Sequence, residues 1–353
     1  MQTLRFLIVL AGLAIFAAGC RTANDAGPQA AIDHYVKSQT LTDSGNLDAA
    51  LAELRQAVQA DPSLSVAHGA AGDIYRKKGD LNMARRSYES ACETNPYAFK
   101  PHYNLGIVYQ MLAEGAASPD KSAGELLGKA VWAYLRAITI RANDADANLN
   151  LSACYYQLGK FEQARQYCQR AVEIDPKNAA AQSNLGIIYD GLGQFDQAIA
   201  AYKSSLELDS SQTQVLMNLA GTYMRQYRYK AAIHAFELAA KEMPKDSAPY
   251  EQIGACQFLW GLEQDAKSEF RQAQEEKALQ AYQTAVRLNP KSAAGHRGIG
   301  TILMIRFIRD RNKTDLRDKA LEAWYTSLEI RPDQNDLRDL VKKYQPKPGE
   351  ANL

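Results

Sequence analysis

The sequence predicts an all-α protein built from repeated pairs of antiparallel helices, and three observations carry this prediction. Particular residue types recur every 34 positions through most of the 353-residue chain. Within each period, apolar residues follow three- and four-residue steps, which place them on one face of a helix. Glycine and proline recur where the two helices of a period would end. Such a period is typical of solenoids, in which each repeat packs against its neighbours.

The 34-residue period is clearest in the middle of the chain. Counting from the first residue of each unit, apolar residues recur at position 7, tyrosine at 11 and alanine at 20: Leu151, Leu185, Leu219 and Ile253; Tyr155, Tyr189 and Tyr223; Ala164, Ala198, Ala232 and Ala266. Glycine ends the first helix and proline follows the second: Gly79, Gly159 and Gly193; Pro62, Pro96, Pro176, Pro244 and Pro290. Small residues at positions 8 and 20 allow the two helices to approach closely, so each period predicts one helical hairpin.

The unit 179–212 carries the fullest set of these features, with Asn184-Leu185-Gly186, Tyr189, Gly193, Ala198, Tyr202 and Leu206. This combination of large, small and aromatic residues resembles the tetratricopeptide repeat. The resemblance implies a right-handed α-solenoid in which the first helix of every pair lines a concave groove. It also implies that the groove binds other proteins.

Counted in register, the repeats form eight units: 31–64, 65–98, 99–144, 145–178, 179–212, 213–246, 247–292 and 293–334. The third, seventh and eighth units are longer than 34 residues. We expect 114–128 in the third unit to form a loop, and 262–288 in the seventh to form one second helix extended by about three turns. A polar capping helix is expected over 335–344, followed by a disordered tail over 345–353.

The first twenty residues predict a signal peptide. Arg5 precedes the uncharged run 6–18, which is too short to span a bilayer as a helix, and small residues follow it. The sequence Ala17-Ala18-Gly19-Cys20 resembles a bacterial lipobox. That resemblance implies removal of residues 1–19, lipidation of Cys20 and a flexible tether over 20–30. The alternative is a hydrophobic first helix that contains a cysteine by chance.

The lipobox also implies a location in the bacterial cell envelope. In enteric lipoproteins an aspartate directly after the lipidated cysteine favours the inner membrane, and Arg21 stands at that place here. We therefore expect a lipid-anchored protein at the outer membrane that faces the periplasm.

Composition and motifs argue against nucleic-acid binding and catalysis. The chain has 41 basic and 40 acidic residues, whereas phosphate binding requires a basic excess. No CxxC, HExxH, GxSxG or phosphate-binding glycine loop occurs. We expect no enzymatic activity, no catalytic residue, no metal and no cofactor.

The histidines and cysteines follow the repeat. His34, His68, His102 and His296 all occupy position 4 of their units, so packing explains them better than a shared metal. Cys92, Cys154, Cys168 and Cys256 fall at core positions, where a free cysteine behaves as a small hydrophobe. A disulfide between Cys154 and Cys168 is the alternative in an oxidising compartment.

A row of amides is the candidate binding site. Position 6 carries Asn104, Asn150, Asn184 and Asn218 in units three to six, and Gln252 in the seventh. An amide donates and accepts hydrogen bonds, so it suits the backbone of an extended peptide. The row resembles the asparagine ladder of long tetratricopeptide superhelices, and Tyr103, Tyr156 and Arg225 flank it. The alternative is that these amides only bond locally.

These features together predict a membrane-anchored scaffold. Its groove would bind extended segments of envelope proteins and so assemble or recruit a larger complex, of the pilus, secretion or peptidoglycan type. The alternative is a regulatory subunit that modulates a catalytic partner such as a glycosyltransferase or a peptidoglycan hydrolase. The expected partners are envelope proteins and, through Cys20, the membrane; the sequence leaves the oligomeric state open.

Overall fold

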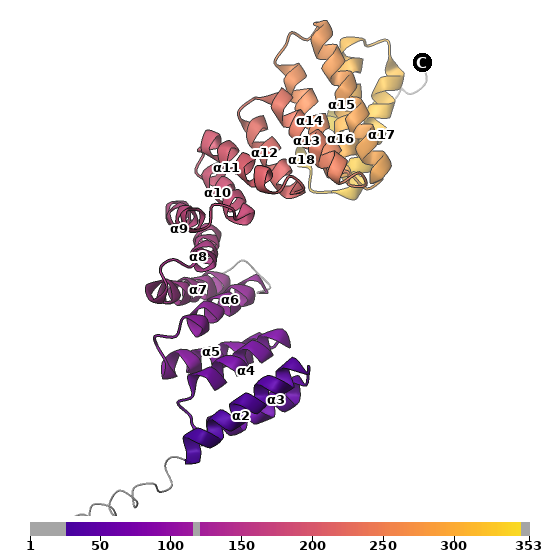
Figure 1. The fold of residues 1–353 in the computed structure, drawn as a ribbon. Coiled ribbons are helices and arrows are strands. Elements are labelled where there is room, and N and C mark those ends of the chain that lie inside the picture. Colours follow the sequence, from indigo (N-terminus) through magenta and orange to yellow (C-terminus); the bar gives the residue numbers. More distant parts are fainter. Residues whose placement is uncertain (1–25, 116–120, 347–353) are drawn as a thin grey trace, which may run out of the picture. The chain divides into compact units, whose positions relative to one another are not determined.

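The computed structural model of the chain describes residues 26–115 and 121–346, which form 17 helices: eight antiparallel pairs and one final helix (Figure 1). The described part of the chain divides after Asp175 into two compact units. The predicted all-α fold of paired helices is confirmed. None of the described helices is long and apolar enough to cross a membrane.

The first unit contains four helix pairs. They are α2 (Ala26–Asp43) with α3 (Leu47–Ala60), α4 (Ser65–Lys77) with α5 (Leu81–Thr94), α6 (Phe99–Glu114) with α7 (Lys121–Ile140), and α8 (Ala145–Gln157) with α9 (Phe161–Ile174). Within this unit the second helix of each pair also packs on the first helix of the next pair.

The second unit contains four further pairs and a final helix. They are α10 (Ala179–Gly191) with α11 (Phe195–Leu208), α12 (Thr213–Arg225) with α13 (Tyr229–Glu242), α14 (Ala248–Leu262) with α15 (Glu269–Leu288), and α16 (Ala293–Arg309) with α17 (Thr314–Ile330). The final helix α18 (Asn335–Tyr344) packs on α17.

A glycine at position 8 and an aromatic ring at position 24 join the two helices in five of the eight pairs. A Cβ atom added to any of these glycines would lie closer than 3.0 Å to the facing ring: Gly72 and Tyr88, Gly106 and Tyr134, Gly186 and Tyr202, Gly254 and Tyr282, Gly300 and Trp324. Because the ring fills the space that a side chain would occupy, the small residue at position 8 sets how closely the helices approach.

The turn between the two helices of a pair requires a left-handed backbone. Gly45, Gly79, Gly159 and Gly193 adopt positive φ angles of 70 to 80° at this turn. In the next repeat, 213–246, the same position is occupied by Tyr227, with φ of 60° and an exposed side chain. A bulky residue at positive φ is strained, whereas glycine is not.

Replacing Tyr227 with glycine is therefore expected to stabilise the second unit by up to about 1 kcal/mol. A non-glycine residue in this conformation costs about 1–2 kcal/mol, and the greater freedom of glycine in the unfolded chain offsets part of the gain. Denaturant unfolding of both proteins, followed by circular dichroism, measures the change. A lower unfolding midpoint for the variant would show that side-chain contacts of Tyr227 outweigh the strain.

The insertion in the third repeat, 99–144, differs from the prediction. Residues 121–128, expected in a loop, form the first turns of α7, while 116–120 lie outside the described residues. The physical reason is the spacing of Leu127, Ala130 and Tyr134, which are all buried on one face of the helix. The apolar face of the repeat thus extends into the inserted residues and keeps them helical.

The insertion in the seventh repeat, 247–292, also differs from the prediction, because 262–288 is not one helix. The turn 263–268 separates α14 from α15, which has 20 residues against 14 in α13. Ser268 caps the new helix, since its Oγ accepts a hydrogen bond from the Arg271 amide at 3.2 Å. The prediction of a three-turn extension from Leu262 was wrong, and the extra residues are divided between the turn and an earlier start of α15.

The described chain begins inside the predicted tether. Helix α2 starts at Ala26, so residues 26–30 are helical; Pro28 lies in the first turn, where proline is tolerated. The predicted signal peptide and lipidated Cys20 lie outside the described residues, as do residues 347–353 of the predicted tail.

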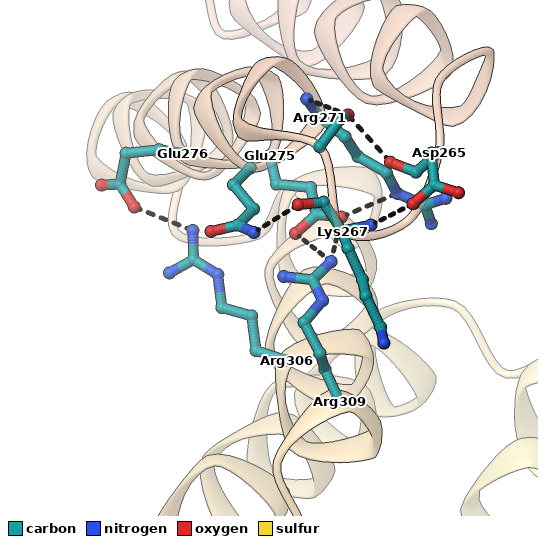
Figure 2. Close-up of polar contacts among 9 residues, drawn as sticks. Asp265, Lys267, Arg271, Glu275, Glu276, Arg306 and Arg309 are labelled. Atoms are coloured by element: carbon teal, nitrogen blue, oxygen red, sulfur yellow. Dashed lines mark hydrogen bonds and ion pairs between the residues drawn. The ribbon is translucent and has the colours of Figure 1, made fainter.

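The long helices of the last two pairs are joined by a buried carboxylate (Figure 2). Glu275 of α15 is 1% exposed and accepts hydrogen bonds from Arg309 of α16 at 2.8 and 3.0 Å. It also accepts one from Arg271 at 3.1 Å, a residue of the early turns of its own helix. Beside it Glu276 pairs with Arg306 at 2.8 Å, and this hydrogen bond lowers the pKa of Glu276. The added turns of the two pairs are therefore packed as one ion-paired block.

Candidate functional site: the first-helix face

The first helices of successive pairs lie side by side within each unit. Contacts connect α4 with α6 and α6 with α8 in the first unit, and α10 with α12 and α14 with α16 in the second. We call the surface formed by these helices the first-helix face. The predicted groove residues Asn104, Asn150, Asn184, Asn218 and Gln252 all belong to these helices, two in the first unit and three in the second.

The first unit has a hollow of about 320 Å³ on this face, which we call the unit-1 hollow. It lies among α2, α4 and α6, with Gly69 and Ala70 of α4 among its lining residues. A Cβ atom added to Gly69 would meet nothing within 4 Å, so the space above this glycine is open. Its wall includes the half-exposed Val66 and the ring of Phe99.

Asp73 lies in the wall of the unit-1 hollow and receives three hydrogen bonds. Its Oδ1 accepts from the Tyr88 hydroxyl at 2.6 Å and from the Asn104 amide at 2.9 Å. Its Oδ2 accepts from Lys100 Nζ at 2.7 Å. Burial, and then the bond to Asp73, raise the pKa of Tyr88, so this phenol stays a donor. Asn104 is 5% exposed, and in this structure its amide holds Asp73.

Asn150 and Tyr103 form the next contact along the first unit. The Asn150 amide donates to the Tyr103 hydroxyl at 3.2 Å, and the Tyr103 ring stacks on Phe99 with centroids 5.6 Å apart. Burial raises the pKa of Tyr103. Tyr156 is 36% exposed and packs against Phe161 of α9. Tyr156 is thus more accessible than the amides that it was predicted to flank.

In the second unit the predicted residues lie in a different setting. Asn184 is half-buried, and Asn218 accepts a hydrogen bond from Gln214 of its own helix at 3.0 Å. Arg225 forms an ion pair with Asp190 and lies over the Phe195 ring at 5.5 Å. The charge of Arg225 is therefore partly neutralised within the unit.

A second hollow of about 340 Å³, the unit-2 hollow, lies between α14 and α16 and includes Gln252. Two charged residues line it, and both are held by neighbours. Glu251 accepts hydrogen bonds from Ser292 at 2.6 Å and Ser247 at 3.1 Å. Arg297 donates to Asp336 of α18 at 2.5 Å, and this bond lowers the pKa of the Asp336 carboxyl.

Four residues that shape the unit-1 hollow were not predicted from the sequence: Gly69, Asp73, Lys100 and Arg141. A signal for one pair was available. Asp73 stands at position 9 of its unit and Lys100 at position 2 of the next, and the structure brings these positions of adjacent first helices together. Opposite charges at these two positions predict a contact between adjacent repeats. A row of identical residues, such as the asparagines at position 6, predicts no such pairing.

Comparison with known proteins agrees with this architecture. Models described as tetratricopeptide repeat match residues 34–64, 143–211 and 191–255, and one described as TPR repeat matches 72–112. The chain is a tetratricopeptide-repeat protein. Repeats of this kind serve as scaffolds for protein–protein interaction, and the described residues form no domain besides the helix pairs and α18.

Solved structures share the fold at low sequence identity. PilW, described as a widely conserved type IV pilus biogenesis factor, is 17% identical; the match covers 64% of this chain and 98% of PilW, with a TM-score of 0.50. Pseudomonas aeruginosa pilF is 19% identical over 67% of this chain and 96% of its own, with a TM-score of 0.49. A tetratricopeptide repeat protein from Parabacteroides merdae ATCC 43184 is 17% identical over 90% and 99%, with a TM-score of 0.44. No curated protein matches the chain.

The histidines at position 4 have a structural role in this tetratricopeptide-repeat protein. Nε2 lies 3.0 Å from the carbonyl oxygen of the proline six residues earlier in three cases: His68 and Pro62, His102 and Pro96, His296 and Pro290. A carbonyl only accepts, so Nε2 carries the proton in each. His34 instead contacts Glu53 at 2.7 Å. Across 26–115 and 121–346, no group of three or more histidine, cysteine or acidic residues could hold a metal.

Replacing His102 with asparagine is expected to weaken the pH dependence of stability. Burial lowers the pKa of His102 below its ordinary 6.5, so the unfolded chain binds the proton more readily than the folded one. His102 therefore contributes stability above about pH 6.5 that is lost as the pH falls towards its folded pKa. Asn148 shows that asparagine at position 4 also donates to the carbonyl six residues earlier.

Urea unfolding at pH 7.5 and 5.5 tests this prediction. The wild-type chain should lose more free energy of unfolding between these pH values than the variant. His68→Asn is the matched control, because His68 occupies the same position of the preceding repeat. If the wild type and the His102 variant lost the same free energy of unfolding between these pH values, His102 would not be a source of the pH dependence.

The cysteines of the described part are separate buried thiols. None of Cys92, Cys154, Cys168 and Cys256 is in a disulfide, so the possible bridge between Cys154 and Cys168 is not formed in this structure. Burial raises the pKa of each of these thiols to about 12. At neutral pH they are protonated, which disfavours nucleophilic chemistry.

Proposed function

We propose that this protein is a membrane-anchored scaffold that binds extended segments of envelope proteins on its first-helix face. One observation carries the proposal. Each compact unit has a hollow on the same face of its repeats, between the first helices, and both hollows combine apolar and polar lining. Side chains of an extended segment would enter such hollows while its backbone meets polar groups at their edges.

We propose that only some amides of the row contact the bound segment. Gln252 lines the unit-2 hollow, and Asn184 is half-buried on the same face. Asn104 is buried and bonded to Asp73, so we assign it to shaping the unit-1 hollow. Tyr103, Asn150, Tyr156, Asn218 and Arg225 would complete the first-helix faces of their units.

The membrane anchor is part of the proposal and depends on the lipobox-like sequence that ends at Cys20. Lipidation there would confine the scaffold to the outer membrane, facing the periplasm. Confinement raises the effective concentration of bound partners, so equilibrium binding alone would promote assembly. PilW, a pilus biogenesis factor, has the same fold, and we extend the proposal to assembly of this kind or of peptidoglycan machinery.

Photo-crosslinking in a bacterial envelope tests the binding face. Benzoylphenylalanine replaces Val66, which is 53% exposed on the first-helix face, or Leu238, which is 40% exposed on the second helix α13. The proposal predicts specific envelope proteins attached at Val66 and none at Leu238. Partners attached only at Leu238 would reject this face.

Fractionation tests the anchor separately. The wild-type protein is expected in outer-membrane fractions, whereas Cys20→Ser should leave the protein uncleaved or released from that membrane. A Cys20→Ser protein that fractionates like the wild type would contradict lipid anchoring at this residue.

A further inference from the structure

The unit-1 hollow exists because one repeat lacks side chains that its neighbours have. Positions 5 and 6 carry Gly69 and Ala70 in this repeat. The corresponding pairs in the following four repeats are Tyr103 and Asn104, Leu149 and Asn150, Ser183 and Asn184, Met217 and Asn218. Since nothing lies within 4 Å of a Cβ atom added to Gly69, the space is not refilled by neighbouring side chains.

One part of the wall of this hollow is apolar. Val66 is 53% exposed, and Tyr35, Ala98, Phe99 and Pro101 are further apolar lining residues. Burying an exposed apolar surface contributes roughly 25 cal/mol per Å². A volume of about 320 Å³ holds one large side chain, so the hollow favours a bulky apolar group over a small or charged one.

The more exposed charged side chains at the rim are basic, since Lys100 is 73% exposed and Asp73, its ion-pair partner, 32%. The carboxylate of Asp73 is occupied by Tyr88, Asn104 and Lys100. Arg141 lies over the Phe99 ring at 4.1 Å, and its side chain is 60% exposed. Its ion pair with Asp144 is long at 3.4 Å, and a guanidinium has five N–H donors. Most donors of Arg141 therefore remain open to a ligand.

We propose that the unit-1 hollow takes an aromatic or large aliphatic side chain of a bound segment, and that Arg141 pairs with an aspartate or glutamate beside it. This inference rests on the proposed function and names the segment that the first unit selects. A carboxylate binds a guanidinium through two parallel hydrogen bonds, which gives the contact direction as well as strength. The aromatic ring beneath the guanidinium keeps it at the rim.

The unit-2 hollow lacks this selectivity. Glu251 is bonded to two serines, and Arg297 to Asp336, so its two charges balance and both have partners within the unit. A segment bound there would meet no surplus positive charge. The preference for an acidic residue is therefore assigned to the first unit alone.

A displayed library of random 12-residue peptides, selected on the full chain in detergent micelles, tests the inference. Enriched peptides are synthesised, and their Kd is measured on the wild type, on Gly69→Leu and on Gly221→Leu. Both glycines are on first helices with nothing near the added Cβ atom, so Gly221→Leu is the matched control. We expect enrichment of a large apolar residue beside Asp or Glu, at least tenfold weaker binding for Gly69→Leu, and less than a twofold change for the control.

Charge reversal tests the rim. Arg141→Glu should weaken binding of the same peptide at least tenfold. A peptide with lysine in place of its acidic residue should bind this variant more tightly than it binds the wild type. Val66→Asp replaces the apolar wall at an exposed position and tests the hollow should Gly69→Leu fail to fold.

The outcomes separate the two levels of the account. Peptides that bind the wild type and all three hollow variants equally would overturn this inference and leave the proposed function in place, with the site elsewhere on the chain. No peptide binding to the wild type would count against the proposed function itself. Enrichment of basic peptides would overturn the assignment of Arg141.

Discussion

Replacing Glu275 with alanine is expected to lower the stability of the second unit by about 3 kcal/mol, since removing one partner of a buried ion pair typically costs 3–5 kcal/mol. The Glu275 side chain is buried, and its carboxylate joins Arg309 of α16 to Arg271 of α15. Without it, two guanidinium groups lie beside each other in the block with no carboxylate between them. Denaturant unfolding of the full chain, with the transition of the second unit resolved, measures the loss.

The neighbouring Glu276→Ala is the control for this prediction. Glu276 forms a comparable ion pair with Arg306, but its side chain is 52% exposed. An exposed pair contributes at most about 1 kcal/mol, so this variant should change little. Similar losses for the two variants would contradict the view that burial makes Glu275 important. Leucine at both Glu275 and Arg309 should recover part of the stability, because Arg309 is then no longer left unpaired, whereas Arg271 still loses its carboxylate partner.

Replacing Gly186 with alanine is expected to lower the stability of the same unit by about 2 kcal/mol. The added Cβ atom would lie 2.5 Å from Cδ1 of Tyr202, whose ring is 1% exposed and has no room to move. Inserting a methyl group into a packed core typically costs about 1–3 kcal/mol. Urea unfolding followed by circular dichroism measures the change.

Gly221→Ala is the matched control, since Gly221 is also helical and nothing lies within 4 Å of its added Cβ atom. Alanine is favoured over glycine within a helix by up to about 1 kcal/mol, so this variant should be slightly more stable than the wild type. If Gly186→Ala were as stable as Gly221→Ala, the close approach of α10 and α11 would not depend on the missing side chain.

The helical pairs were predictable because their determinants are local. Gly186 and Tyr202 stand 16 residues apart at fixed positions of the repeat, and Gly193 lies at the turn between their helices with φ of 71°. Each feature limits one short stretch of backbone, and all of them agree. Tyr227 is the exception: its place in the period predicted the turn, although its residue type did not.

The insertions were harder to predict because their periodicity is ambiguous. Ala266, Phe270 and Ala273 repeat the spacing of Ala278, Tyr282 and Ala285, and only the second set is the buried core of the pair. Phe270 is 39% exposed, and Ala266 lies in the turn before α15. Spacing alone does not show which of two equivalent sets packs against α14.

The amide row shows a different limit. Asn104, Asn150 and Asn218 occupy the same position of the repeat, but they bond to Asp73, Tyr103 and Gln214 respectively. Each partner depends on a residue that varies from one repeat to the next. The position of a side chain was therefore predictable, whereas its availability for a ligand depended on its neighbours.

Comparing an intact partner with its own isolated segment tests the central claim most directly. A partner captured by crosslinking at Val66 would be purified, and the attached stretch of about 15 residues synthesised as a peptide. Calorimetry would then measure the Kd of each for the full chain. Binding of an extended segment predicts that the peptide binds within about tenfold of the intact partner and competes with it for one site. An intact partner that binds tightly, together with a peptide that neither binds nor competes, would show that the protein recognises a folded surface and would contradict the account.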